Sequence, residues 1–265
     1  MMLLIMKLTL APLLVAAATL ITRKWGAKVG GLLMGMPLTT GPIFLFLAID
    51  QGSRFAARTS VRILLGIIGL AAFAVAYAVS SNRVGWAGCL AFAVAAFIAF
   101  SVAASWLGSN VVVAALTAWV ALLLATSLIH KAKLGAAPPP PPWWDLLVRM
   151  IAVAALTLAA TVLAARLGPV LSGIVATYPV AITVVVTFTH VQLGRDGVLA
   201  MLRGSVLSWF AFTNCFLAIG LLVKELGIAV SMSLGAVAAV VTSVLVLWMD
   251  RVVAPASVPH EVQKS

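Results

Sequence analysis

Two proline-bearing apolar stretches carry the residues best suited to bind a molecule inside a membrane. The first holds Pro37, Thr39, Thr40 and Gly41 within the run Met-Pro-Leu-Thr-Thr-Gly-Pro. A proline inside a helix removes one backbone hydrogen bond and clashes with the preceding turn. In lipid the freed carbonyl needs protein, water or a ligand as its partner. The stretch therefore predicts a broken helix whose backbone and hydroxyl groups line a cavity, with a simple kink as the alternative.

The second stretch repeats this pattern with a different set of hydroxyl groups. Tyr178 directly precedes Pro179, and Thr183 and Thr187 follow at helical spacing. Proline, glycine and threonine are all common in membrane helices, so a kink with threonines bonded to their own backbone also fits. Because the prolines are placed alike in both stretches, a binding site and a kink carry equal weight.

Ionisable residues within membrane spans are functional candidates because burying a charge in lipid is costly. Asp50 and His190 lie at the far ends of the two proline-bearing stretches. His190 is a candidate proton relay, since imidazole changes charge near neutral pH, or else a hydrated interfacial residue. Asp50 could pair with an arginine one or two turns along. Arg203 could hold an anionic substrate or extend towards lipid headgroups.

Asn214 belongs to the most polar stretch of the second half, which also places Ser205, Ser208 and Trp209 on one helical face. An amide near the middle of a membrane needs a hydrogen-bond partner. A contact with another helix and a contact with a substrate explain Asn214 equally well.

The two proline-bearing stretches are copies of one another. Gly26 to Gly52 aligns with Gly168 to Gly194 at an offset of 142 residues, which superimposes the two prolines. Matching interruptions in two halves of a membrane protein are typical of carriers built from repeats, with the site between the repeats. We therefore expect a substrate site where the span 28–49 meets the span 170–191.

The composition predicts a membrane protein. Hydrophobic residues make up 64% of the chain and charged residues 9%, and the mean hydropathy is +1.20. An ordinary soluble domain carries roughly 25% charged residues. The apolar runs are long and unbroken, whereas a β-barrel would need alternating apolar and polar residues. We therefore expect an all-α, polytopic transmembrane helical bundle.

The net charge of +11 does not indicate a nucleic-acid partner. The basic residues lie between apolar segments, where they set topology and meet anionic lipid headgroups. The sequence contains no nucleophile elbow, zincin motif, phosphate-binding P-loop or metal-ligand spacing. We therefore expect no enzyme activity, no metal site and no cofactor. The two cysteines, Cys89 and Cys215, are interpreted as packing residues.

About nine membrane spans are expected, since a transmembrane helix needs roughly 20 apolar residues. They form two four-helix repeats, 1–107 and 146–250, joined by an extra helix and a proline-rich linker in 108–145 and followed by a polar tail, 251–265. One intervening helix inverts the second repeat relative to the first, whereas a single helix across 84–130 would leave the repeats parallel. The expected spans are 3–22, 28–49, 60–80, 84–106, 109–130, 146–166, 170–191, 199–222 and 227–249.

The distribution of basic residues predicts the orientation of these spans. The larger share falls on the side that holds the C-terminus, which places the C-terminus inside and the N-terminus outside a bacterial inner membrane. The apolar N-terminal segment could be a signal peptide, but the repeat needs it as a retained first helix.

The second half contains a glycine-led span with a central proline, a histidine near its end, a glycine and a Leu-Arg pair, namely Gly173, Pro179, His190, Gly194 and Leu202-Arg203. This pattern resembles the small bacterial membrane proteins called GlpM-like. The resemblance implies that the chain is a fused pair of such inner-membrane units. It implies an architecture more than a biochemical activity.

The predicted function is a carrier or permease for a small molecule, with the bilayer and the substrate as partners and a homodimer left open. A non-transporting scaffold or accessory subunit and a lipid-handling protein are the alternatives. A polar cavity reached from one face would favour the carrier. A closed seam of glycine and alanine would favour the scaffold, and a lateral opening to lipid would favour lipid handling.

Overall fold

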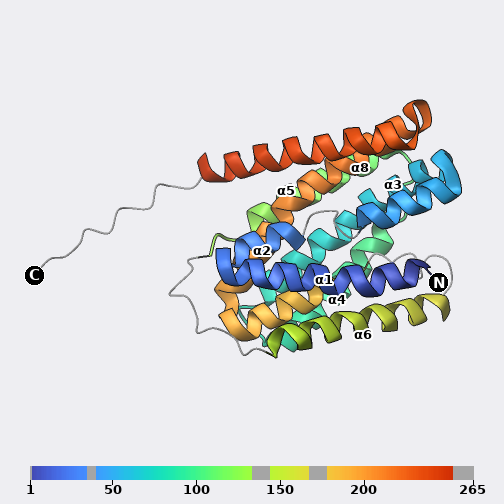
Figure 1. Cartoon of the computed structure of the whole chain (residues 1–265). Helices are drawn as coiled ribbons and strands as arrows, with labels where there is room; N and C mark the ends of the chain where they lie inside the picture. The colour runs from blue at the N-terminus through green and yellow to red at the C-terminus, as the bar shows by residue number, and fades with distance from the viewer. Residues whose placement is uncertain (1, 35–39, 133–143, 167–177, 253–265) are drawn as a thin grey trace, which may run out of the picture.

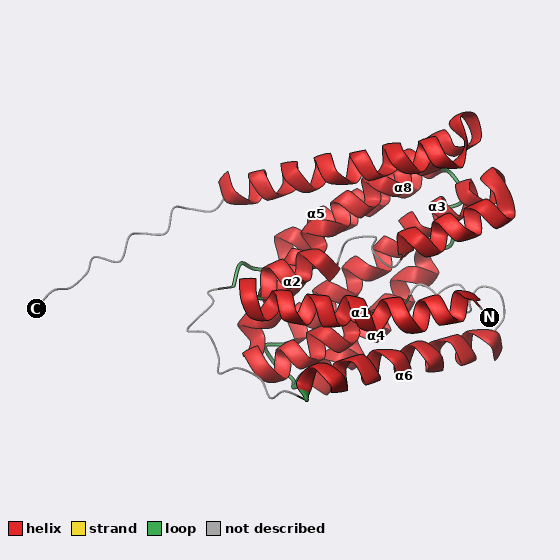
Figure 2. Ribbon diagram, in the orientation of Figure 1, coloured by secondary structure: helices red, strands yellow, loops and turns green. Residues whose placement is uncertain are grey.

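The computed structural model describes residues 2–34, 40–132, 144–166 and 178–252 (Figure 1). Within these ranges the protein is helical throughout and has no strands (Figure 2). The helices are α1 (Met2–Trp25), α2 (Ala27–Met34), α3 (Thr40–Ser80), α4 (Trp86–Ala104), α5 (Val111–Leu128), α6 (Asp145–Arg166) and α8 (Val180–Val252). Five of them, α3, α4, α5, α6 and α8, are long and apolar enough to cross a membrane. The all-α membrane class predicted from composition is thereby supported.

Glycines divide the two longest helices into segments. Gly52 breaks α3 with a φ of 81°, and Gly194 and Gly227 break α8 with φ values of 65° and 77°. Only glycine adopts such left-handed angles without a steric cost. α3 therefore consists of the segments 40–51 and 53–80, and α8 of the segments 180–193, 195–226 and 228–252.

The expected spans map onto these helices and segments in part. α1, α4, α5 and α6 each cover one expected span, and segments of α3 and α8 cover three more. The two proline-bearing spans include residues 35–39 and 170–177, which lie outside the described residues, so Pro37 and Thr39 cannot be placed. The described chain therefore gives seven helices, whereas the sequence predicted about nine spans.

The two glycine breaks that correspond in the predicted repeat, at Gly52 and Gly194, are far apart along the bundle. The second segment of α3 starts after Gly52 and reaches Tyr77 about 38 Å further on, at 1.5 Å of rise per residue. There the Tyr77 hydroxyl lies 3.2 Å from Nδ1 of His190, which is four residues before Gly194. The α3 segment thus spans the distance between the two breaks.

The first helices of the two predicted repeats, α1 and α6, lie side by side and run in opposite directions (Figure 1). Arg23 near the end of α1 donates a hydrogen bond of 2.8 Å to Asp145 at the start of α6. The C-terminus of α1 thus contacts the N-terminus of α6. This contact lies at the same end of the bundle as Gly194.

Close packing holds α2 against the central segment of α8. A Cβ added to Gly31 would lie 2.0 Å from the carbonyl oxygen of Met201, and one added to Gly204 would lie 2.2 Å from that of Lys28. The Ser205 hydroxyl donates to the Gly31 carbonyl at 3.0 Å. Small residues on both helices let their backbones approach, as is common in membrane bundles.

The outer helices present apolar side chains away from the bundle. Leu116 and Val120 on α5 are exposed, as are Val240 and Val244 on the last segment of α8. In water, such surfaces would favour aggregation, whereas in a bilayer they face lipid chains. The exposed apolar faces of the outer helices therefore agree with the membrane protein that the composition predicts.

Candidate functional site

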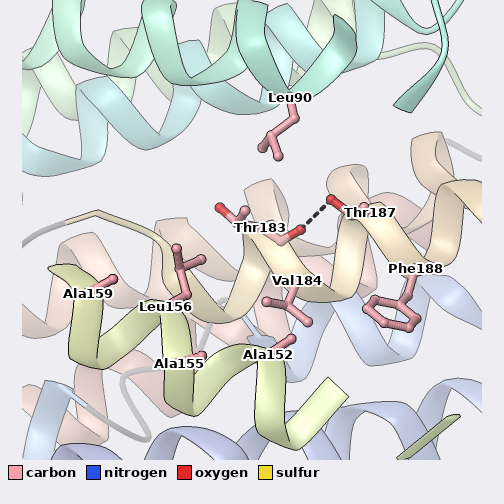
Figure 3. Close-up of a pocket in the computed structure, with 9 residues that line it drawn as sticks. All are labelled: Leu90, Ala152, Ala155, Leu156, Ala159, Thr183, Val184, Thr187 and Phe188. Carbon is pink, nitrogen blue, oxygen red and sulfur yellow. Dashed lines mark hydrogen bonds between the residues drawn. The ribbon is translucent and has the colours of Figure 1, made fainter. Parts of the chain in front are cut away.

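A pocket of about 460 Å³ lies between α4, α6 and the first segment of α8 (Figure 3). It is open to its surroundings and apolar apart from two threonines. Its size falls within the range of roughly 300–1,000 Å³ that is typical of small-molecule sites. The lining residues are Leu90 from α4, Ala152, Ala155, Leu156 and Ala159 from α6, and Thr183, Val184, Thr187 and Phe188 from α8.

A polar stripe runs along the first segment of α8, and part of it lines the pocket. Thr183, Thr187 and His190 are spaced at i, i+4 and i+7, so they share one helical face. The Thr187 hydroxyl donates to the Thr183 carbonyl at 2.8 Å (Figure 3), and the Thr183 hydroxyl donates to the hydroxyl oxygen of Tyr178 at 2.9 Å. The Tyr178 hydroxyl keeps its own hydrogen for a further acceptor.

Helix α8 starts immediately after Pro179, which explains why the stripe begins there. Val180 is the first residue of α8, and the Thr183 N–H donates to the Pro179 carbonyl at 2.9 Å. Proline suits the first turn of a helix because its missing N–H would have no intrahelical partner there. In the described part of this span, the proline thus precedes a helix rather than interrupting one.

Aromatic contacts join the polar stripe to α3 and α4. Tyr77, which is 0% exposed, lies with its ring centroid 5.8 Å from that of His190. The ring of Tyr178 packs edge to face against Phe97 at 5.5 Å. Tyr77 was not predicted as a site residue, yet the chain has only two tyrosines, and both meet this stripe. The rarity of tyrosine in this chain was the sequence signal that could have pointed to Tyr77.

An ionic cluster lies at the end of the bundle next to the pocket. Asp145 is 1% exposed and accepts from Arg23 at 2.8 Å, from Arg149 at 2.9 Å and from Gln192 at 2.6 Å. Arg149 also donates to Gln192 at 2.7 Å, and its guanidinium carbon lies 4.6 Å from the ring centroid of Phe188. Such a cation–π contact is favourable, more so where water is excluded. The cluster ties α1, α6 and α8 together.

A second cluster ties α2 and α5 to the last residues of α8. Asp250 accepts a hydrogen bond from Lys28 and lies 3.5 Å from a guanidinium nitrogen of Arg203. Arg203 also donates to the carbonyls of Thr126 and Ile129 at 3.0 Å, where α5 ends. A cation beside unpaired carbonyls at a helix C-terminus is stabilising. Arg203 thus binds the end of α5 instead of extending towards headgroups.

No protein-family model, curated protein or solved structure matches this chain.

The structure places Asn214 away from the pocket. Its amide nitrogen donates to the Thr242 hydroxyl at 2.8 Å, and its amide oxygen accepts from the Trp119 indole at 3.2 Å. These bonds join α5 to two segments of α8. Both ends of the amide thereby have helix partners, as one of the two sequence explanations anticipated.

The described part of the first proline-bearing stretch also lies apart from the pocket. Thr40 and Gly41 begin α3 and are partly exposed. Asp50 is exposed and takes part in none of the ion pairs among the described residues. Phe44 packs against Phe216 of the central α8 segment at 5.2 Å. The described contacts of this stretch include α1 and two segments of α8, and only the second stretch lines the pocket.

Proposed function

We propose that the protein is an integral membrane carrier for a small apolar or amphipathic molecule that binds in the pocket between α4, α6 and the first segment of α8. One observation carries this proposal. A half-helix that starts after Pro179 contributes Thr183 and Thr187 to the lining of an open, apolar pocket and holds His190 one turn beyond them. An apolar lining with a few convergent polar groups is typical of small-molecule sites.

We further propose that two four-helix units, within about nine spans, form inverted repeats. The left-handed glycines Gly52 and Gly194 support this, because they correspond in the predicted repeat and are separated by the length of the second α3 segment. The antiparallel pair α1 and α6 supports it as well. The GlpM-like resemblance is retained as a proposal for the ancestry of each unit, in a bacterial inner membrane with the N-terminus outside.

Ion pairs between the halves supply a mechanism for alternating access. Arg23 and Lys28 flank the break between α1 and α2 in the first half, and each binds a carboxylate of the second half, Asp145 or Asp250. Both ties therefore close the same end of the bundle. Rocking of one four-helix unit against the other would break these ion pairs and open this end of the bundle. Alternating access by rigid-body motion around a fixed site requires such an opening.

A lipid-handling protein is the second candidate, and one observation favours it. The pocket is open and lined mainly by alanine, leucine, valine and phenylalanine, as a lateral opening to lipid chains would be. In this case the occupant would come from the bilayer and would not be moved across it. Flux measurements separate the two functions.

The carrier proposal is tested with purified protein in proteoliposomes. Radiolabelled hexadecanoate, tetraphenylphosphonium and glucose serve as probes, and the initial uptake rate is compared with that of protein-free liposomes. We expect protein-dependent uptake of at least one amphipathic probe, none of glucose, and a lower rate in Thr183→Val and Thr187→Val. Thr117→Val is the matched control, because Thr117 on α5 bonds only to its own helix. Uptake that is equal with and without protein for every probe would overturn the carrier.

A further inference from the structure

A charged group lies beside one end of the pocket, outside its lining. Arg149 precedes the pocket-lining Ala152 by three residues on α6, so the two share a helical face. Its guanidinium carbon lies 4.6 Å from the ring centroid of Phe188, which lines the same pocket. From Arg149 to Ala159, the last lining residue of α6, the helix advances about 15 Å. The site is therefore a row of small apolar side chains with a guanidinium at one end.

The cluster at this end holds one positive charge in excess. Arg23 and Arg149 donate to the same oxygen of Asp145, so two guanidinium groups share one carboxylate. The other oxygen of Asp145 accepts from Gln192, which leaves the carboxylate well supplied with donors. Arg23 is 30% exposed and uses one of its five N–H donors in this contact. Its remaining donors can meet a second anion.

We propose that the pocket binds a single-chain amphiphilic carboxylate, with its hydrocarbon chain along Ala152, Ala155 and Ala159 and its carboxylate at Arg23. This inference rests on the proposed function, because it names the substrate class of the same site. Guanidinium groups bind carboxylates through short, paired hydrogen bonds. Each methylene that is buried in an apolar groove contributes to binding. Arg149, held against Phe188 and Asp145, positions the charged end and is too buried to bind the anion itself.

The test measures equilibrium binding to the full chain in phosphatidylcholine nanodiscs, without any flux. Radiolabelled hexadecanoate is the probe, and hexadecanol and hexadecyltrimethylammonium compete for it as uncharged and cationic analogues of the same chain length. We expect hexadecanoate to bind about tenfold more tightly than hexadecanol, as one charge-assisted contact allows. The cationic analogue should compete least.

Two variants with matched controls assign the two ends of the ligand. Arg23→Gln should remove the preference for hexadecanoate, and Arg23→Lys should keep part of it. Lys24→Gln should leave it unchanged, because Lys24 lies over the Trp25 ring at 4.8 Å. Ala155→Phe should abolish binding of all three compounds by filling the groove. Ala236→Phe, on an exposed face of α8, should leave their binding unchanged.

Several results would overturn this proposal. They are equal affinities for hexadecanoate and hexadecanol, the same loss in Lys24→Gln as in Arg23→Gln, and full binding in Ala155→Phe. Effective displacement of hexadecanoate by phosphatidylglycerol would identify a bilayer-lipid site instead. Carboxylate binding without flux would refute the carrier and leave this site standing. Flux of another probe without carboxylate binding would refute the substrate class alone.

Discussion

Replacement of Asp145 by asparagine tests how strongly the ionic cluster holds the two halves together. The substitution keeps the shape of the side chain and removes the negative charge that Arg23 and Arg149 share. Arg149 is only 4% exposed, so its guanidinium would remain buried without an anion. Removing one partner of a buried ion pair costs about 3–5 kcal/mol. We expect a loss near the lower bound, because Gln192 still accepts a bond from Arg149.

The free energy of unfolding is measured by detergent titration in mixed micelles, and the thermal midpoint is measured alongside it. For a chain of this size, about 3 kcal/mol corresponds to a fall of roughly 6–12 °C. Asp50→Asn is the matched control, since Asp50 is exposed and outside the ion pairs among the described residues. The double variant Asp145→Asn with Arg149→Met removes the orphaned charge and should recover part of the loss. Equal stability of Asp145→Asn and Asp50→Asn would refute the reasoning.

Three further substitutions, with Gly85→Ala as the control for the first, test local contacts by the same stability measurement. Gly31→Ala should cost about 1–3 kcal/mol, because its Cβ would lie 2.0 Å from a backbone oxygen of α8. Gly85→Ala should cost less than about 1 kcal/mol, because a Cβ added there meets open space. Equal losses of stability in Gly31→Ala and Gly85→Ala would contradict the close packing of α2 against α8. Asn110→Ala should cost about 0.5–2 kcal/mol, since its side chain caps α5. Tyr77→Phe should lower the free energy of unfolding by about 0.5–1.5 kcal/mol, because the bond to His190 is lost. An unchanged free energy of unfolding would count against the cap in Asn110→Ala and against the bond to His190 in Tyr77→Phe.

The class of the fold could be predicted from the sequence, because lipid leaves few ways to satisfy a backbone. Helices are among the few structures that do so, and 64% hydrophobic composition required them. The breaks at Gly52 and Gly194 were also within reach, since each glycine closes one copy of the repeat. Whether a break ends a helix or bends it depends on neighbouring helices, which a single sequence does not describe.

The candidate site was predicted only where its residues are close in the chain. Thr183, Thr187 and His190 share a helical face, so periodicity alone places them together. Tyr77 meets His190 across 113 positions, and Asp145 meets Gln192 across 47. Such pairs form only when the helices pack. Residue types alone could not show which arginine would find which carboxylate.

Asn214 and Arg203 illustrate a second limit. Both are polar residues of the central α8 segment, and a substrate contact was one explanation for each from the sequence. The structure gives them helix partners instead, at Thr242 and at the end of α5. A buried polar group must find some partner, and its type does not say whether that partner is protein or ligand.

The proposed inverted arrangement of two repeats is tested most directly by the sidedness of corresponding positions. Arg54 and Asp196 follow the two repeat-closing glycines at the offset of 142 residues, and both are exposed. Single cysteines at these positions, in a chain with Cys89 and Cys215 replaced by alanine, are labelled with a membrane-impermeant maleimide in right-side-out and inside-out vesicles. Inverted repeats predict that Arg54→Cys and Asp196→Cys react in opposite vesicle types. Labelling of both from the same side would contradict the account.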